Sequence, residues 1–515
     1  MEFVDSVSTA LHGVGLRSPS EVLLLCVIFL LTAVLCRRLV LGARYKWPPG
    51  PRGWPLLGNT LLLSPVSDQT CANITRLGKS YHPDVFTLNM FAGKKYVVLN
   101  SYTALKEAFI TQGNSFSDRP TDWPFLYTND NRKRIGIFLE PFTESWKREK
   151  KYLMRTARRF GYATATAEPA IHQESDHLVG LIKEKGGKPF DLYPPLSLCM
   201  LNVNFSLIFS TTYEAGDAEL SGFMDALQGF AMNVFKLYDL QPVLPLLERL
   251  GNSAQLREGK AAARELLDFT RLHIERHRAT LDPDHPRDMV DACLIEMAKA
   301  DPNGDLRDFT EEKFLWMIFF FIPDQGDTAA GLFLFLLLAV ALNPDVQEKV
   351  YREIQDVIGD RPPRLQDKAR LPYTEACILE TLRMDTTFWL LVPHFTAADV
   401  DLMGYRIPKS TTVIPNIYEV HFNPELWGDP EKYRPERFIN EQGQIARPDY
   451  FIPYSMGRRT CIGEQQSQKE FFIFFVMLLQ KFKFKLPDED PKPKLASQWL
   501  WVYPPKFRLQ AEARA

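Results

Sequence analysis

One cysteine in this sequence stands where its thiol would be reactive. Cys461 precedes a segment, residues 471–479, in which phenylalanine and leucine recur at helical spacing. A thiol at the start of a helix faces the positive end of the helix dipole and backbone N–H groups that have no helical partner. Arg458 and Arg459 add further positive charge. These features all favour the thiolate over the thiol.

Two glycines flank this cysteine. Gly457 and Gly463 carry no side chain, so the backbone beside Cys461 could approach a large, flat group. A thiolate near N–H donors, with this clearance and an arginine nearby, suits an axial ligand of haem iron. The alternative is an inert buried cysteine at the start of a helix. This stretch alone does not decide between the two.

The same stretch also resembles a known family signature. The pattern Tyr454-x-x-Gly457-x-Arg459-x-Cys461-x-Gly463 is similar to the haem-binding motif of the cytochromes P-450, with tyrosine in place of the usual leading phenylalanine. The resemblance runs from about residue 20 to near the C-terminus. It implies haem b (iron protoporphyrin IX) as the cofactor, with Cys461 as the axial thiolate and metal ligand.

Three charged residues follow the order and spacing of the same family. Glu380 and Arg383 lie in "ETLR", and Arg437 lies in "RPERF". The resemblance implies that they form a buried ion network that braces the haem side of the core and takes no part in catalysis. Taken alone, Glu380 and Arg383 would be a solvated helix pair contributing a few tenths of a kcal/mol.

Four positions resemble those that hold the haem propionates in this family. They are Trp146, Lys150, His394 and Arg459. Lys150 stands where an arginine is usual, which keeps the positive charge but loses the planar two-donor geometry of a guanidinium. The surrounding basic segment also includes Lys147, Arg148 and Lys151. It is a candidate docking face for an electron donor, and a solvated helix surface is the alternative.

A polar interruption, "FIPDQGDTAAG" at residues 321–331, divides a strongly apolar segment. The resemblance implies a long central helix that crosses the distal face of the haem and places Asp327 and Thr328 at the acid and alcohol positions. These two are the candidate catalytic residues. A hydroxyl can donate a hydrogen bond to the oxygen substrate, and a carboxylate can relay protons through water. The opposite thiolate pushes electron density toward the O–O bond.

The interruption also departs from the family pattern. Asp324 and Gln325 stand where a small residue and a glycine are usual, and Gly326 is displaced by one position. We expect Pro323 and Gly326 to supply the local distortion. Asp324 faces either the pocket, where it must be protonated, solvated or paired, or the surrounding helices. The alternative is a helix broken by proline whose polar residues cap the new ends.

The N-terminal residues predict a membrane anchor. An apolar run at residues 22–36 is preceded by acidic residues and followed by basic ones, which places the bulk of the chain in the cytosol. A cleaved signal peptide is the rival interpretation. We expect a luminal tail and anchor over 1–46, with the helix at about 20–41, a proline-rich hinge over 47–59, and a cytosolic catalytic domain over 60–515. The expected location is the endoplasmic reticulum membrane, with a single pass.

Composition and periodicity limit the fold and the partners. The net charge of −2 gives no basic excess for nucleic acid, and the seven scattered cysteines indicate a reducing compartment. Long helical patterns alternate with short strand signals: a hairpin at 84–100, with two β-rich runs around Ala92-Gly93, and strands and turns at 401–416. We expect a mainly α fold with small β-sheets in one large domain, and the resemblance implies the cytochrome P-450 fold. Several large apolar residues are pocket candidates, although core packing explains each of them equally well: Phe125, Phe319, Phe388, Trp389 and Leu390.

The resemblance implies a membrane-bound monooxygenase. It would insert one oxygen atom from O2 into a lipophilic small molecule, with electrons from NADPH through a flavoprotein reductase and with cytochrome b5 as a second partner. If Asp324 and Gln325 impair oxygen activation, the alternative is a haem-thiolate isomerase, dehydratase or peroxide-dependent enzyme. The presence of Asp327 and Thr328 favours the monooxygenase. A third interpretation is a non-catalytic membrane protein that binds haem or lipid.

Overall fold

A computed structural model describes Thr32 and residues 45–493 and 506–514, except for 56, 64–69, 122, 130–133, 241–243, 245–247, 249–252, 300–308, 323–327 and 387. The predicted anchor helix at about 20–41 therefore lies outside the described residues, apart from Thr32. Pro323, Asp324, Gln325, Gly326 and Asp327 also lie outside them. The expectations for these residues stay predictions.

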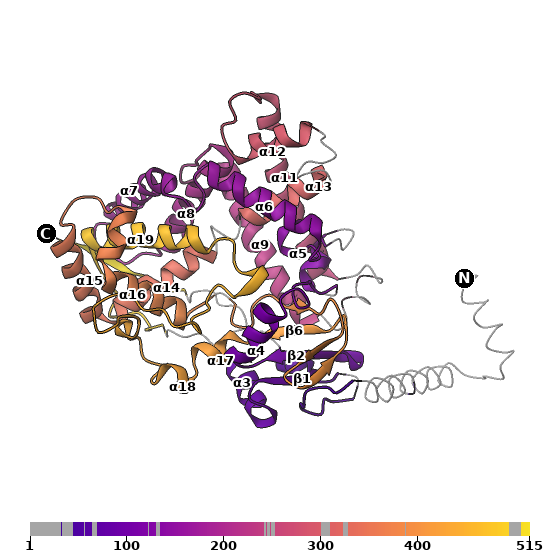
Figure 1. The fold of residues 1–515 in the computed structure, drawn as a ribbon. Coiled ribbons are helices and arrows are strands. Elements are labelled where there is room, and N and C mark those ends of the chain that lie inside the picture. Colours follow the sequence, from indigo (N-terminus) through magenta and orange to yellow (C-terminus); the bar gives the residue numbers. More distant parts are fainter. Residues whose placement is uncertain are drawn as a thin grey trace.

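Helices make up most of the molecule (Figure 1). Their starts follow simple local chemistry. Thr143 and Thr310 accept hydrogen bonds from backbone N–H groups in the first turns of α6 and α13, and proline opens α15 and α16. The helices are α3 (Thr70–Tyr81), α4 (Tyr102–Lys106), α5 (Gly136–Leu139), α6 (Glu144–Arg159), α7 (Glu168–Glu184), α8 (Tyr193–Phe209), α9 (Ala218–Leu240), α11 (Ala254–Ala279), α12 (Met289–Ala298), α13 (Glu311–Phe321), α14 (Ala329–Leu342), α15 (Pro344–Val357), α16 (Pro372–Met384), α17 (Ile417–His421), α18 (Pro424–Trp427) and α19 (Glu464–Lys481).

The strands form three small sheets. The largest has the order β1-β2-β6-β3, where only β2 and β6 run parallel, and it lies at one edge of the helical body beside α3, α4 and α17 (Figure 1). The predicted hairpin at 84–100 is confirmed as β1 and β2, which pair in the register Val85 to Leu99. The strands are β1 (Val85–Asn89), β2 (Lys95–Leu99), β3 (His394–Phe395), β4 (Val400–Leu402), β5 (Tyr405–Ile407), β6 (Thr412–Pro415), β7 (Phe482–Lys485) and β8 (Gln510–Ala513).

The most apolar helix lies in the core. Every residue of α14 from Ala329 to Ala341 is buried, and its neighbours include α8, α15 and α16. Across the described part of the chain, no helix is by itself both long and apolar enough to span a membrane. The pair α14 and α15 passes that test only jointly, on length and composition, with a bend of 105° between the two helices.

The predicted ion network is confirmed as a buried structure. The carboxylate of Glu380 accepts from Arg383 at 2.8 and 2.9 Å and from Arg437 at 3.0 Å. The side chains of Glu380 and Arg383 are fully buried, and Arg437 is almost so. Arg383 also donates to the carbonyl groups of His421 and Pro430. The network therefore joins α16 to the segments around residues 421–437.

A second buried carboxyl, Glu470 in α19, has little to neutralise it. One oxygen accepts from Gln466 at 2.7 Å, and among the described residues the further polar side chain that favours its ionised form is Asn204. Gln466 is itself fixed, because its oxygen accepts from the backbone N–H of Ala163 at 2.6 Å. Burial raises the pKa of Glu470 to about 8 from its ordinary 4.5.

We expect Glu470→Gln to stabilise the protein at high pH. Because the folded state holds a proton that the unfolded state loses above pH 4.5, the wild type loses stability as pH rises from 4.5 to about 8. Glutamine has nearly the same shape and cannot ionise. At pH 8 its advantage in unfolding free energy should be on the order of 4 kcal/mol, and at pH 4.5 it should be small.

Urea unfolding at several pH values measures this effect. The exposed Glu441→Gln is the control and should follow the wild type. Equal pH dependence in wild type and Glu470→Gln would mean that Glu470 is paired or hydrated in the folded protein.

Candidate active site

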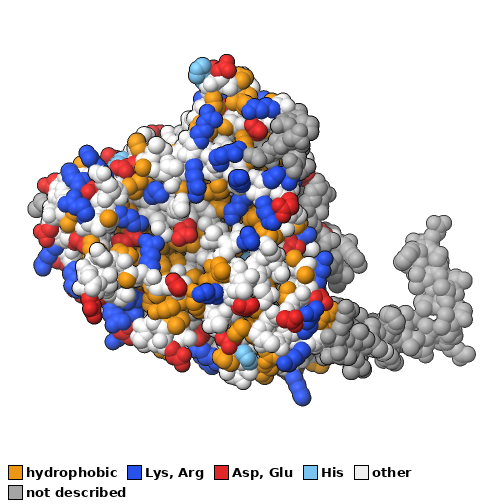
Figure 2. Space-filling model, viewed as in Figure 1, with side chains coloured by type: hydrophobic (Ala, Val, Ile, Leu, Met, Phe, Trp, Pro, Cys, Tyr) orange, Lys and Arg blue, Asp and Glu red, His pale blue; other side chains and the backbone are white. Residues whose placement is uncertain are grey.

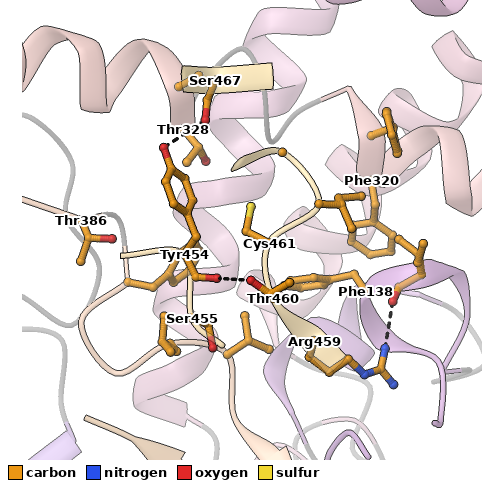
Figure 3. A pocket seen from close by; sticks show the side chains of 18 of the residues that line it. Phe138, Phe320, Thr328, Thr386, Tyr454, Ser455, Arg459, Thr460, Cys461 and Ser467 are labelled. Carbon is orange, nitrogen blue, oxygen red and sulfur yellow. Dashed lines mark hydrogen bonds between the residues drawn. The ribbon is translucent and has the colours of Figure 1, made fainter. Parts of the chain in front are cut away.

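One large cavity gathers most of the predicted site residues. It lies among α6, α13, α14 and the loop 453–463, and Cys461 and Thr328 both line it (Figure 3). Trp146, Lys150, His394, Arg459 and Gly463 line the same cavity. Gly457 is not among the lining residues, and Asp327 lies outside the described part of the chain. Residues far apart in the sequence thus meet around a single thiol.

The loop before α19 fixes Cys461. Its backbone N–H donates to the Tyr454 carbonyl at 3.0 Å, and α19 begins three residues later, at Glu464. Cys461 is therefore close to the positive end of α19, as predicted. Gly457 serves this loop in a way that was not predicted. It adopts a φ of +79°, and a Cβ there would come within 2.3 Å of the Phe109 carbonyl oxygen. Its glycine is required for packing against Phe109 rather than for clearance in the cavity.

The remaining described cysteines lie in different surroundings. Cys461 is exposed to the cavity, whereas four others are buried, and burial raises the pKa of each of these thiols. The four are Cys71, Cys199, Cys293 and Cys377. Within the cavity, Cys461 is thus the cysteine suited to ligate a metal as thiolate.

A cluster of cations borders the cavity. Arg459 donates to the carbonyl groups of Ser117, Ile137 and Glu140 at 2.9, 3.0 and 2.6 Å, and its guanidinium lies 4.0 Å from the centre of the Trp146 ring. Lys150 donates to the Arg458 carbonyl at 3.0 Å. These contacts hold the charges in place without neutralising them.

The lowered pKa values of the cations in this cluster indicate that it would bind anions. Burial, the largest cause, lowers the pKa of Arg459 to about 9 and that of Lys150 to about 8, and the charge of Arg459 lowers the latter further. Burial and the charge of Arg119 also lower the pKa of His394. Buried cations that repel one another favour the binding of anions. The residues present therefore fit a group that brings carboxylates to this side and a metal to Cys461.

Two predicted contacts have other partners in the structure. The indole N–H of Trp146 donates to the Ile137 carbonyl at 2.9 Å and is therefore already used. The ring of Trp146 instead stacks against the guanidinium of Arg459. The Nδ1 atom of His394 lies 2.6 Å from the Phe116 carbonyl oxygen. Nδ1 is therefore the donor to Phe116, and Nε2 is the atom left for a ligand.

The sequence did not point to Arg119, which also lines the cavity. It donates to the Phe138 carbonyl at 3.2 Å and to the Pro393 carbonyl at 2.9 Å. The positive charge of Arg459 lowers the pKa of Arg119, although burial of Arg119 is the larger cause. No local motif marks Arg119, because only the folded chain brings it to the cluster.

The rest of the cavity is mainly aromatic. Phe138 lies 5.7 Å from Phe125 and 5.4 Å from Phe320, measured between ring centres. Of the pocket candidates from the sequence, Phe125, Phe319 and Phe388 line the cavity. Trp389 and Leu390 do not, and pack instead in the core beside the largest sheet. The cavity therefore offers apolar surface to a ligand near Cys461 and Thr328.

A helical fold in which a thiol and a cation cluster share one cavity has the features of a haem-thiolate protein. The chain belongs to the cytochrome P-450 family, since the family model described as "Cytochrome P450" matches residues 48–511. Members of this family are oxidoreductases of the monooxygenase type, with haem ligated through a thiolate, and this chain is one of them.

Animal relatives match over nearly the whole chain. The chain is 33% identical over 496 residues to Cytochrome P450 2U1 of Homo sapiens, covering 91% of this chain and 89% of that protein. It is 32% identical over 479 residues to Cytochrome P450 2D3 of Rattus norvegicus, covering 91% and 92%. It is 33% identical over 490 residues to Cytochrome P450 2D10 of Mus musculus, covering 94% of each.

Proposed function

We propose that this chain is a membrane-anchored haem-thiolate monooxygenase that inserts one oxygen atom from O2 into a lipophilic small molecule. Electrons would come from NADPH through a flavoprotein reductase, with cytochrome b5 as a further partner. The observation that supports this most is the meeting of Cys461, Thr328 and the cation cluster in one aromatic cavity.

In this proposal the cofactor is haem b, and the Cys461 thiolate would bind its iron. When bound, haem supplies the reduction and cleavage of dioxygen. Arg459, Lys150 and Arg119 hold its carboxylates, which would offset the repulsion among these cations. With the carboxylates bound, His394 would be the imidazolium, so that Nδ1 still donates to Phe116 and Nε2 donates to a carboxylate. Trp146 keeps the Arg459 guanidinium in place by stacking against it.

Thr328 and Asp327 are the proposed proton-handling pair. Thr328 lines the cavity directly before α14, where its hydroxyl can donate a hydrogen bond to the oxygen substrate. Asp327 is proposed to relay protons from solvent on the basis of sequence alone. The phenylalanine-rich wall would exclude water from the substrate and favour apolar molecules.

The membrane and partner assignments belong to the same proposal. Residues 1–46 would anchor the protein in the endoplasmic reticulum membrane, 47–59 would form a stiff hinge, and 60–515 would be the cytosolic catalytic domain. Lys and Arg side chains gather over α6 on the face shown in Figure 2. Lys151, Arg155, Arg158 and Arg159 of α6 are exposed, whereas Lys147 is paired with Glu144 at 2.5 Å. This surface suits an acidic face of a reductase.

The test is NADPH-driven turnover with purified reductase, for wild type and Thr328→Ala. The substrate is a lipophilic compound chosen because it shifts the haem absorbance spectrum on binding. Consumption of NADPH and oxygen and formation of hydrogen peroxide and product are all measured. We expect the wild type to couple NADPH oxidation to product. Thr328→Ala should still consume NADPH but release peroxide, with product per NADPH falling roughly tenfold or more, because a proton donor is lost.

Thr328→Ser, which keeps the hydroxyl, is the matched control and should retain coupling. Unchanged coupling in Thr328→Ala would remove Thr328 from the mechanism. Product formed with an organic peroxide but never with NADPH and reductase would identify a peroxide-dependent enzyme instead. No turnover by either route would favour a non-catalytic haem protein.

A further inference from the structure

Three side chains with metal-ligand chemistry meet between α7 and α8. Glu174 and His177 lie on α7 at i, i+3 spacing, and Cys199 lies on α8. The Nδ1 atom of His177 is 3.5 Å from Oε2 of Glu174 and 4.0 Å from the sulfur of Cys199. The three ligand atoms all lie within 4.8 Å of one another. None of these residues lines the cavity around Cys461.

The distance from His177 to Glu174 is long for a hydrogen bond and close to that of a coordination site, although Cys199 also hydrogen-bonds to Glu174. A good N–H to oxygen hydrogen bond joins atoms about 2.9 Å apart. A tetrahedral zinc ion with bonds of about 2.3 Å to sulfur and about 2.0 Å to nitrogen and oxygen separates its ligand atoms by about 3.3–3.6 Å. The two distances measured from His177 lie within about half an ångström of these values. We propose that Glu174, His177 and Cys199 bind a single zinc ion.

The charge balance of this site favours a divalent cation. Among the described residues, the one ion pair of Glu174 is with His177, and no lysine or arginine reaches it. Both Glu174 and Cys199 are buried, and a buried carboxylate or thiolate is costly without a positive charge beside it. A zinc ion would supply that charge and would bind the carboxylate and the thiolate as a neutral set.

The surroundings orient the ligands and leave access to solvent. Asn202 donates from Nδ2 to Glu174 at 3.2 Å, and its amide is fixed by hydrogen bonds with the backbone of Tyr213 at 2.8 and 2.9 Å. Such a partner holds a ligating carboxylate in position. The His177 side chain is 28% exposed, so an ion can reach the site and a water can take the fourth position.

A second cluster, formed by His277, Asp288 and Asp291, shows what a satisfied site looks like. His277 lies 2.7 Å from Asp288, a normal hydrogen-bond distance. Arg287 binds both carboxylate oxygens of Asp291 at 2.6 and 2.9 Å. Hydrogen bonds and an arginine already complete this cluster. It is therefore a brace between α11 and α12 and not a zinc site.

The proposed zinc would tie α7 to α8. Helix α7 packs against α19, which begins just after Cys461. Helix α8 packs against α14, which begins just after Thr328. The ion would thus stabilise the scaffold behind the active site without touching the cavity. This inference does not depend on the reaction that the cavity carries out.

The test uses the full chain with haem bound. After treatment with a chelator and gel filtration, zinc is titrated in competition with a chromophoric chelator, and bound metal is counted by mass spectrometry. We expect one zinc per chain and a higher melting temperature with zinc. Loss of a residue that only hydrogen-bonds to a metal ligand lowers metal affinity about tenfold or more. Cys199→Ser and His177→Ala each remove a proposed ligand, so each should lower zinc affinity at least tenfold.

Cys293→Ser removes another buried cysteine, and Asp288→Asn alters the satisfied cluster. Both should bind zinc as the wild type does. The haem spectrum of each variant reports folding and the cavity separately from zinc binding. The proposal is overturned if the wild type retains no zinc, or if Cys199→Ser and His177→Ala retain it with unchanged affinity while their haem spectra are normal.

Discussion

Cys461→Ser is expected to abolish the thiolate-type absorbance of the reduced carbon-monoxide complex, together with NADPH-driven product formation. Serine has nearly the same shape as cysteine, but its hydroxyl does not supply a thiolate to iron. The backbone hydrogen bond from residue 461 to the Tyr454 carbonyl does not involve the side chain and should persist. The effect should therefore be on the ligand and not on the fold.

Circular dichroism and the reduced carbon-monoxide spectrum check this prediction together. Cys377→Ser is the matched control, because Cys377 is buried in α16 and does not line the cavity. It should keep the thiolate-type spectrum even if it is somewhat less stable. An unchanged spectrum in Cys461→Ser would disprove the assignment of Cys461 as the iron ligand.

Glu380→Ala is expected to destabilise the protein by about 3–5 kcal/mol, because it leaves two buried guanidinium groups without their shared carboxylate. Arg383 would keep its bonds to the carbonyl groups of His421 and Pro430, and Arg437 its bonds to Trp427 and Asp429. These neutral or more exposed acceptors do not replace a buried charge. Loss of soluble, haem-containing protein and a lower urea midpoint would be the direct readouts.

Asp268→Ala is the matched control for this experiment. Asp268 and Arg271 form an ion pair with the same i, i+3 spacing, but both side chains are more than half exposed. Exposed pairs contribute roughly 0–1 kcal/mol, so this variant should differ little from the wild type. Comparable losses in both variants would show that burial of Glu380 is not what makes its network important.

The local motifs could be predicted from the sequence because the spacing of neighbouring residues determines their local structure. Cys461 lies just before α19 because apolar residues at helical spacing specify that helix, and the hairpin of β1 and β2 follows from two β-rich runs around one turn. The ion network needed more than local pattern. "ETLR" alone predicts a solvated pair, and only the family resemblance indicated that Glu380 is buried.

Other parts of the site depend on contacts that no local pattern encodes. Arg119 joins Arg459 because the fold places it between α5 and the segment around Pro393. Gly457 is needed for its positive φ and its approach to Phe109, which has no signal beyond the glycine itself. The indole of Trp146 bonds to Ile137, which the motif did not predict.

By itself the sequence determined the chemistry available to this protein: a cysteine at a helix start, a threonine beside an aspartate, and a mainly helical chain with small sheets. These depend on residues close together along the chain, where spacing fixes geometry. The tertiary structure decided which charges share the cavity, which phenylalanines line it, and that Glu174, His177 and Cys199 meet. Such contacts arise from the packing of distant helices, and no short-range spacing determines them.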